Sequence, residues 1–509
     1  LRTPGSVFDS YSGDGVGIHD ENGEVRFDDI VAYNQGQTID DWGDAKEKYN
    51  GQYVVSSNGK IDGTNAGSGF IRRASMNYHN WYGVLSTLTS ELTDNLTLVA
   101  GLDGRYYKGE HFRRLENLLG ADAYLSTRDA NNPARLITQP SAADFGNFYD
   151  DSYKDGSNVL AYHNDGLVNW LGLFAQLEYS TDRMNIFATV SGSNQGFKRI
   201  DYFNYLESDP ERETDWQNFL GGTVKAGANF NINETMNIFF NGGYFSKQPI
   251  FDNVFVNFRN DVDPNVKNQT VYAFEGGYGL RTRQVKANVN LYYTQWGNRQ
   301  FDRTLQVNDS NGDAVDALAI LRDVSEVHTG IEIDASYQPN RQVTFKTMFS
   351  LGNWEYTKDF TATLSNLDND NPIEGGNRRT LYADGLKVGD AAQTTSYFGV
   401  VYRPVDGMSI YGDYTVYDRL FARFNVTETQ FFSPGGKVVE LPSYGLVDLG
   451  ASYRFDFNKV DVTFRLNVNN VFDTEYVAEL LTNRTDDFNS NQGWYGFGRT
   501  WNAGLKFTF

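Results

Sequence analysis

Residues able to carry out covalent chemistry are few in this sequence, and they form no recognisable constellation. The chain has no cysteine, which removes thiolate nucleophiles and thiolate metal sites together. Its five histidines are scattered, and none stands at metal-ligand spacing from another. The sequence contains no G-x-S-x-G elbow, no H-E-x-x-H motif and no phosphate-binding glycine loop. These absences predict a protein that is not an enzyme and requires no cofactor.

One short segment carries oxygen ligands at alternate positions. Residues 309–313 read Asp-Ser-Asn-Gly-Asp, so Asp309, Asn311 and Asp313 resemble the start of a calcium-binding loop. The bidentate glutamate that completes an EF-hand loop is missing downstream. A solvated Asp/Asn turn explains the same residues and is the alternative to Ca²⁺ at this segment.

Aromatic residues make a ligand-binding site a better hypothesis than a catalytic one, since they form 15% of the chain. Two groups of rings stand near Asn and Asp in segments that lack the alternation of strands. Such rings suit sugars or other amphipathic ligands, through stacking combined with hydrogen bonds. Anchoring at a membrane interface is the alternative for the same rings. The candidate ligand-binding residues are Phe251, Phe255, Phe258, Trp494, Tyr495 and Phe497.

Strands must position these residues, and the end of the chain indicates this most clearly. From residue 500 to residue 509, the odd positions are apolar and the even positions are polar or small. Residues 447–457 and 460–468 alternate in the same way, and the two residues between them predict a tight hairpin. About ten alternating residues suffice for a tilted strand to cross a bilayer. We expect lipid on the apolar face and a watery lumen on the other, lined by Asp448, Asp461, Arg465 and Lys506.

The hairpin recurs along the chain. Short turns are predicted near residues 93–95, 180–183, 233–235, 281–284, 339–341, 404–407 and 458–459. Long connections alternate with them, above all residues 108–166, 352–390 and 471–498. A soluble β-sandwich would have more frequent turns and compact loops. Short turns at one end and long loops at the other are typical of bacterial outer-membrane barrels, so the fold class is an all-β, transmembrane antiparallel β-barrel.

Composition agrees with a barrel. The mean hydropathy is only −0.52, as expected when every second strand residue faces water. The net charge of −21 argues against a nucleic-acid partner. We assign residues 1–80 to a long extracellular loop region with little regular structure, and residues 81–509 to about fifteen barrel strands. The first residue is Leu rather than Met and no signal peptide is visible, so we expect the natural chain to begin earlier.

Several motifs resemble those of TonB-dependent outer-membrane receptors. Residues 466–476, Leu-Asn-Val-Asn-Asn-Val-Phe-Asp-Thr-Glu-Tyr, are similar to the family's penultimate-strand motif, which a loop and a final strand ending in Phe follow. Residues 260–278 resemble another family segment, in which Lys267 and Glu275 fit the pattern and the middle acid is replaced near Thr270. Residues 330–333, Gly-Ile-Glu-Ile, fit a third. Residues 81–83, 105–111 and 246–249 resemble receptors of the Bacteroidota type.

The resemblance implies a barrel of about 22 strands with an N-terminal plug domain. The present strands would be roughly strands 8–22 of that barrel, and the plug has no counterpart in this sequence. The implied partners are the TonB–ExbB–ExbD complex through the plug, a surface lipoprotein, and outer-membrane lipids. The lumen residues could then contact a plug as well as a substrate, and Phe509 would be the barrel-assembly signal.

The resemblance implies active import of a scarce nutrient, namely a glycan, a peptide or a metal chelate, across the outer membrane. Two alternatives stay open. The chain could form a passive porin without a plug, or it could be the membrane-anchored barrel component of a surface complex.

Overall fold

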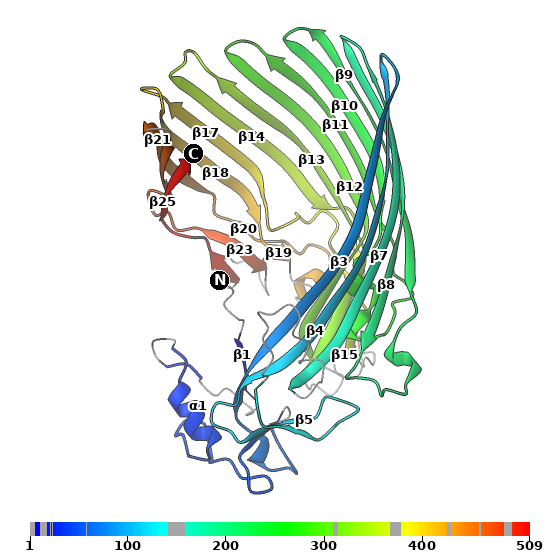
Figure 1. Cartoon of the computed structure of the whole chain (residues 1–509), viewed down its shortest axis with the longest axis vertical. Helices are drawn as coiled ribbons and strands as arrows, with labels where there is room; N and C mark the ends of the chain where they lie inside the picture. Colours follow the sequence, from blue (N-terminus) through cyan, green and yellow to red (C-terminus); the bar gives the residue numbers. More distant parts are fainter. Residues whose placement is uncertain are drawn as a thin grey trace.

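One antiparallel sheet dominates the computed structural model, and it curls around an open interior (Figure 1). The structure describes residues 6–10, 18–20, 22, 24–56, 59–140, 158–308, 314–366, 378–424, 429–457, 460–482 and 491–509. Within these residues, every helix is too short or too polar to span a bilayer.

The sheet is a meander in which each long strand pairs with the next. Its strands, in order, are β3 (Phe70–Thr93), β4 (Leu96–Asn117), β7 (Val159–Ser180), β8 (Met184–Asp201), β9 (Gln217–Asn233), β10 (Met236–Lys247), β11 (Gln269–Arg281), β12 (Val285–Asn308), β13 (Ala314–Tyr337), β14 (Val343–Tyr356), β17 (Ala392–Tyr402), β18 (Met408–Phe421), β21 (Tyr444–Phe457), β22 (Val460–Asn469) and β25 (Thr500–Thr508). Each expected short turn within the described residues lies where one of these strands ends and the next begins, and the turn expected at residues 458–459 lies outside the described residues. We call the end of the sheet that carries these turns the short-turn end, at the top of Figure 1, and the opposite end the long-loop end.

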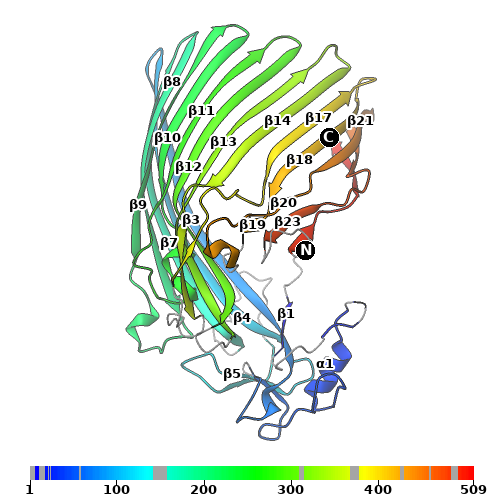
Figure 2. The same cartoon turned by 180° about the vertical axis from the view of Figure 1, so that it is seen from behind.

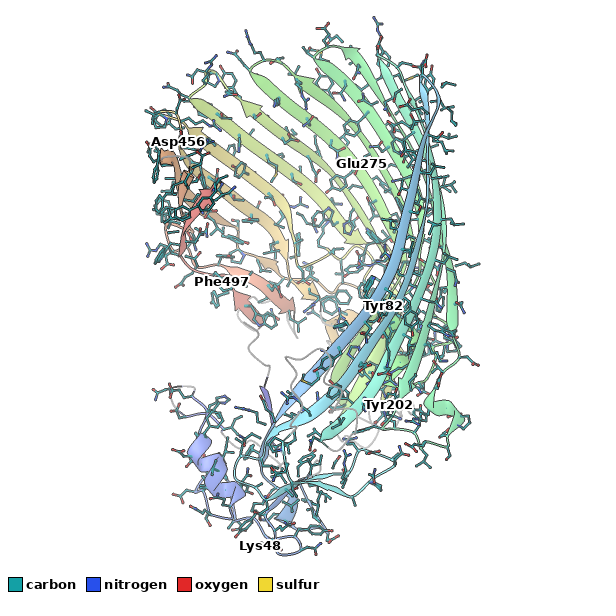
Figure 3. The ribbon with its side chains drawn as sticks, in the orientation of Figure 1. Lys48, Tyr82, Tyr202, Glu275, Asp456 and Phe497 are labelled. Atoms are coloured by element: carbon teal, nitrogen blue, oxygen red, sulfur yellow. The ribbon has the colours of Figure 1, made fainter. Side chains whose placement is uncertain are left out.

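The two faces of the sheet differ in polarity. Phe464 lies opposite Leu505, whereas the next residue, Arg465, lies opposite Gly504. Because residues directly opposite share a face, the alternation of one strand carries over to its neighbours. The apolar face exposes Leu102, Leu173, Val224, Phe240, Leu291, Phe349, Phe398, Leu449, Phe464 and Leu505. We call the other side the polar face; Figure 3 labels Tyr82 of the apolar face and Glu275 of the polar face.

The sheet is open between its first and last long strands (Figures 1 and 2). Among the described strands, β3 pairs with β4 and, through Phe70–Ala74, with β1 (Ser6–Ser10). In the described part of the chain, β25 pairs with β22 alone, and all nine residues of β25 are exposed. The meander bears out the all-β architecture, while the total of about 22 strands and the absence of a plug stay predictions.

A small layer of other elements covers the long-loop end near β3. It contains α1 (Phe27–Asn34), η1 (Asn65–Gly67) and a three-stranded sheet of β2 (Val54–Ser56), β5 (Ala123–Ser126) and β6 (Arg135–Ile137). The side chain of Asn34 is buried and donates to the backbone oxygens of Phe70 and Leu119, while it accepts from the Phe70 N–H at 3.1 Å. This amide ties α1 to the first residues of β3.

The expected boundary at residue 81 therefore falls inside a strand. β3 begins at Phe70, and both Phe70 and its neighbour Ile71 are fully buried. Alternation could not indicate this start, since the covering layer buries both faces of the sheet there. Whether residues 1–80 lie outside the cell stays a prediction.

The long connections also contain more regular structure than their sequences indicated. Strands β4 and β7 extend into residues 108–166, so that connection is shorter than expected. The remaining elements are η3 (Pro210–Arg212), α2 (Phe251–Val254), η4 (Val256–Phe258), β15 (Phe360–Asn366), β16 (Arg378–Leu381), β19 (Arg423–Phe424), η5 (Thr429–Phe432), β20 (Glu440–Leu441), β23 (Val477–Thr482) and β24 (Gln492–Tyr495).

Candidate functional site

The connection between β10 and β11, residues 248–268, folds back onto the polar face of the sheet. A row of directly opposite residues on β3, β4, β7 and β8 consists of His79, Gly109, Gly166 and Arg199. The ring of Phe251 occupies the space above Gly166, where an added Cβ would lie 3.1 Å from the Phe251 Cζ atom. Glycine in this row thus makes room for the returning segment.

Hydrophobic packing holds the start of this segment. The Phe251 ring lies 5.8 Å from that of Phe197 and 4.8 Å from that of Phe255. Phe255 is only 3% exposed, whereas Phe258 is 71% exposed. Asn257 and Phe258 both have left-handed backbone angles, with φ of 54° and 57°. Of the three expected ligand-binding phenylalanines, two therefore anchor the segment and only Phe258 is presented to solvent.

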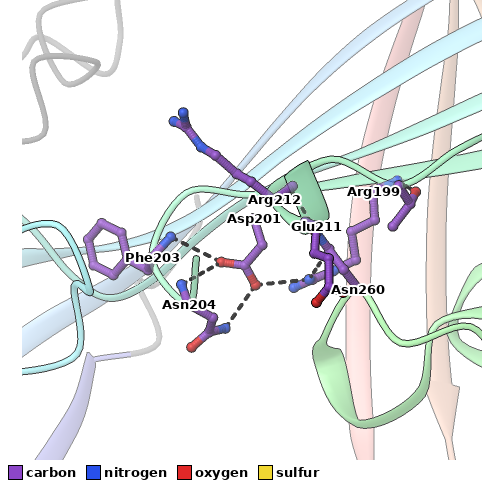
Figure 4. Close-up of polar contacts among 8 residues, drawn as sticks. Arg199, Asp201, Phe203, Asn204, Glu211, Arg212 and Asn260 are labelled. Atoms are coloured by element: carbon purple, nitrogen blue, oxygen red, sulfur yellow. Dashed lines mark hydrogen bonds and ion pairs between the residues drawn. The ribbon is translucent and has the colours of Figure 1, made fainter. Parts of the chain in front are cut away.

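A buried ion pair anchors the segment further along (Figure 4). Arg199 Nη1 donates to Asp201 Oδ2 and to Asn260 Oδ1, at 2.9 Å in each case. Asn260 Nδ2 in turn donates to the backbone oxygens of Glu211 and Arg212, at 2.7 and 2.8 Å. The Arg199 and Asp201 side chains are buried, and such fully paired charges fix geometry. No sequence motif indicated this clamp, because its members come from three separate connections and strands.

A second ion pair joins the segment to β13. Arg322 donates to Asp263 Oδ2 from Nη2 at 2.6 Å and from Nε at 3.1 Å. Asp263 is buried. Burial raises the pKa of the nearby Asp302 carboxyl to about 6, and the negative charges of Asp263 and Asp252 add to the shift. The segment is therefore held at two places, by Arg199 of β8 and by Arg322 of β13.

Strand pairing brings together two histidines that are scattered in the sequence. His79 Nδ1 lies 2.5 Å from the Tyr107 hydroxyl, and His111 Nδ1 lies 2.6 Å from Asn77 Oδ1. The two imidazole centroids are 6.3 Å apart. Burial lowers the pKa of His111 below its usual value, and His79 lowers it further. Only the register of β3 against β4 places them side by side, so residue spacing could not reveal the pair.

A third polar cluster lies on β12, β13 and β14. Glu326 is 1% exposed and accepts from Arg299 Nη1 at 2.5 Å and contacts His328 Nε2 at 3.2 Å. The His328 ring stacks on Trp354 at 5.3 Å, and Trp354 Nε1 donates to the Tyr292 hydroxyl at 2.9 Å. Charged and aromatic groups therefore lie in direct contact on this part of the polar face.

Neutral amides stand among charged side chains on the polar face nearer the short-turn end. Asn237 Nδ2 donates to Asn229 Oδ1 at 2.6 Å, and Asn288 Nδ2 donates to Asp334 Oδ2 at 3.0 Å. Gly279 lies between Asn237 and Asn288, so their side chains lean over its bare backbone. These residues line a hollow of about 1090 Å³. The amides offer donors and acceptors without net charge.

The pairing of β18, β21, β22 and β25 places all four expected lumen residues on the polar face. Asp448 accepts from the backbone N–H of Asn470 at 2.8 Å, so it closes the turn after β22. Asp461 accepts from Arg454 Nη2 at 2.7 Å. Contact of Asp448, Asp461, Arg465 and Lys506 with a plug or a substrate stays a prediction.

The expected aromatic group near the C-terminus is exposed. Trp494 and Tyr495 belong to β24, and Phe497 follows it with an exposed fraction of 86%. In the described part of the chain, no ring contact joins this group to Phe251 or Phe255. Phe509 is 97% exposed. Ligand binding by these rings, and the role of Phe509 in assembly, stay predictions.

The expected calcium ligands Asp309, Asn311 and Asp313 lie outside the described residues. Among the residues that are described, no group of three or more His, Asp or Glu side chains is placed to hold a metal ion.

A two-faced antiparallel meander with short turns at one end is now established, and comparison with known families identifies it. The model of the family "TonB dependent receptor-like, beta-barrel" matches residues 3–471. The chain belongs to this family. The resemblance seen in the motifs is thereby confirmed, and with it the location of the family in the Gram-negative outer membrane. The Bacteroidota type stays a prediction.

Solved structures of the same fold are distant in sequence. The copper transporter OprC is 15% identical, with a TM-score of 0.57 over 86% of this chain and 57% of that protein. The unliganded ferric citrate transporter FecA is 13% identical, with a TM-score of 0.53 over 86% and 57%. BauA, the ferric preacinetobactin receptor from Acinetobacter baumannii, is 13% identical, with a TM-score of 0.51 over 86% and 55%. No match was found among the curated proteins. This TonB-dependent receptor chain thus spans little more than half the length of these transporters.

Proposed function

We propose that this chain forms the wall of a TonB-dependent importer that carries a scarce nutrient across the outer membrane. The observation that supports this most strongly is the returning segment, residues 248–268. Packing of Phe251 and the Arg199–Asp201–Asn260 clamp hold it on the polar face at the long-loop end. A segment fixed inside the curled sheet narrows the entrance, as a selective importer requires and an open pore does not.

In this proposal, the ligand first meets the exposed rings at the long-loop end. Phe258 and the Trp494, Tyr495 and Phe497 group offer stacking surfaces there. The polar face then provides the route, lined by the Glu326 cluster and the neutral amides. Amides exchange hydrogen bonds with water or with a moving segment without the cost of separating charges, so they suit a surface along which contacts must change.

Energy coupling follows from the family. We assign it to TonB, driven by ExbB and ExbD, acting on a plug domain outside the described residues. A surface lipoprotein is a further proposed partner, outer-membrane lipids cover the apolar face, and Ca²⁺ at Asp309, Asn311 and Asp313 is part of the same proposal.

The nutrient is a glycan, a peptide or a metal chelate. The names of the three similar structures refer to copper, ferric citrate and ferric preacinetobactin. They favour testing metal ions and metal chelates first, although their identity of 13–15% supports the fold alone.

Growth and uptake tests separate import from its alternatives. The strain that carries the natural gene is compared with a deletion of that gene and a deletion of tonB, under limitation for copper, iron chelates, glycans or peptides in turn. For an importer, we expect one nutrient for which both deletions abolish uptake, with recovery when the gene is restored. Uptake that survives loss of TonB, together with ion conductance of the purified protein in planar bilayers, would indicate a porin. Absence of both would indicate a membrane-anchored scaffold.

A further inference from the structure

A pocket at the long-loop end lies between the returning segment and an extension of the sheet. Residues 326–337 of β13 pair with β14, whereas residues 317–322 pair with β15. β15 in turn pairs with β16. In this extension Arg322 lies opposite Thr361, and Thr363 lies opposite Arg378, so these residues share one face. The opposite face, which includes Ala362 and Leu381, is buried in a hydrophobic cluster.

The first of these faces forms one wall of the pocket. The returning segment supplies the other wall through Val262, Asp263, Asn265 and Lys267, and the enclosed volume is about 720 Å³. This volume falls in the range of sites for small ligands. Both walls are rigid, because β-pairing fixes one and the Arg322–Asp263 ion pair fixes the other to it.

The charged side chains of the pocket are unevenly paired. Lys267, Lys358 and Arg378 are exposed, and within the described residues none of them forms an ion pair or a side-chain hydrogen bond. Among the lining residues that the structure describes, the acids are Asp263, Asp323 and Asp359. Asp263 is already neutralised by Arg322.

The described lining therefore carries four basic side chains, Arg322 included, against three acidic ones, although the whole chain has a net charge of −21. An acidic surface repels anions, so a basic pocket within it concentrates them at one place. The neutral lining residues include five with polar side chains, namely Asn265, Asn298, Gln300, Thr361 and Thr363. These side chains can hydrogen-bond the groups between the anionic ends of a ligand.

We propose that this pocket binds a hydrophilic polyanion, a small molecule with two or more carboxylate or phosphate groups. Lys267 holds one end from the returning segment, and Lys358 and Arg378 hold the other from the extension. Arg378 suits carboxylate or phosphate through its fork of N–H donors. The inference rests on the proposed import function and names its substrate class, because the pocket lies at the entrance to the polar face.

Isothermal titration of the full natural protein in detergent tests this assignment, with citrate and pyrophosphate as probes and glucose as a neutral comparator. We expect both anions to bind and glucose not to bind. A variant with Lys267→Gln, Lys358→Gln and Arg378→Gln should weaken anion binding roughly 30-fold, since each exposed charge contributes a modest share. Raised salt should weaken the wild type and leave the residual binding of the variant nearly unchanged.

Two control variants separate the pocket from general surface charge. Arg379→Gln is the first control. Arg379 is the neighbour of Arg378 but faces away from the pocket, and its guanidinium lies 4.9 Å from the centre of the Phe432 ring. A second triple variant, with Lys60→Gln, Arg283→Gln and Arg341→Gln, removes three exposed cations elsewhere. Both should bind the anions as the wild type does. Electrophoretic mobility before and after heating checks that every variant is folded.

The proposal is overturned if neither anion binds the wild type, or if the two triple variants weaken binding equally. These results leave TonB-dependent uptake untouched, because titration requires no energy coupling. Conversely, anion binding that depends on the pocket, combined with uptake that survives loss of TonB, supports the site and refutes the importer.

Discussion

Two adjacent residues of β14 allow a direct test of which face of the sheet meets lipid. Phe349 lies opposite Ile333 and Ser396, and it is 38% exposed on the apolar face. Ser350 lies opposite Glu332 and Thr395 on the polar face. The two positions share the same depth and differ only in direction, so arginine at each compares the two faces alone.

The expected penalties differ by several kcal/mol. Arginine on the lipid face of a barrel costs about 2–4 kcal/mol near the bilayer midplane. Phe349→Arg also removes a ring that lipid covers, which adds about 1.5–3 kcal/mol. Ser350→Arg places its guanidinium beside Glu332 in a wet interior, where an ion pair contributes about 0–1 kcal/mol. We therefore expect a destabilisation of about 3.5–7 kcal/mol for Phe349→Arg and little change for Ser350→Arg.

Urea titration in phosphatidylcholine vesicles measures both variants of the natural protein, with the folded fraction read from mobility before and after heating. The midpoint for Phe349→Arg should fall well below that of the wild type. Equal shifts for the two variants, or a larger shift for Ser350→Arg, would refute the assignment of the apolar face to lipid. In that case, something other than water would have to cover the polar face.

Three further changes have defined expectations. Asn34→Ala removes a buried amide that makes several backbone hydrogen bonds. We therefore expect the free energy of unfolding to fall by about 3 kcal/mol and trypsin to cleave the layer around α1 faster. Gln37→Ala, at an exposed residue, should change neither quantity. Glu326→Gln leaves the Arg299 cation without its ionic partner, so the urea midpoint should fall by the equivalent of about 2–3 kcal/mol; an unchanged midpoint would contradict the ion pair. For Asp302, whose pKa rises from 3.8 to about 6 on folding, the folded state holds the proton more tightly, and stability increases as pH falls through that window. Asp302→Asn should therefore raise the melting temperature at pH near 8, by the equivalent of about 1–2 kcal/mol after allowance for partial exposure, and should have little effect near pH 4.

The part of the fold that the sequence predicted is the part that alternation encodes. Residues 447–457 and 460–468 alternate over their whole lengths, and the structure pairs them as β21 and β22, with Asp461 and Arg465 on one face and Phe464 on the other. A membrane on one side and water on the other impose this period of two, so it is written in each strand separately. The short turns follow from the same pattern.

The candidate site could not be predicted in this way, because its contacts join distant strands. His79 and His111 meet only through the register of β3 with β4. Phe251 and Phe255 looked like loop aromatics, yet they pack on the polar face over a glycine. Neither arrangement leaves a signal in the local sequence. The histidine pair depends on strand register, and the returning segment has no periodic pattern of apolar residues.

The division between these two parts of the chain has a physical basis in strand length. A strand needs about 9–11 residues to cross a bilayer, but β12 and β13 each contain 24. The surplus lies at the long-loop end, where both faces can be covered and alternation is no longer required. Arg322 and its neighbours belong to this surplus, as does the partner strand β15. Ligand specificity can therefore change by substitution in these extensions without disturbing the apolar band that keeps the sheet in the membrane.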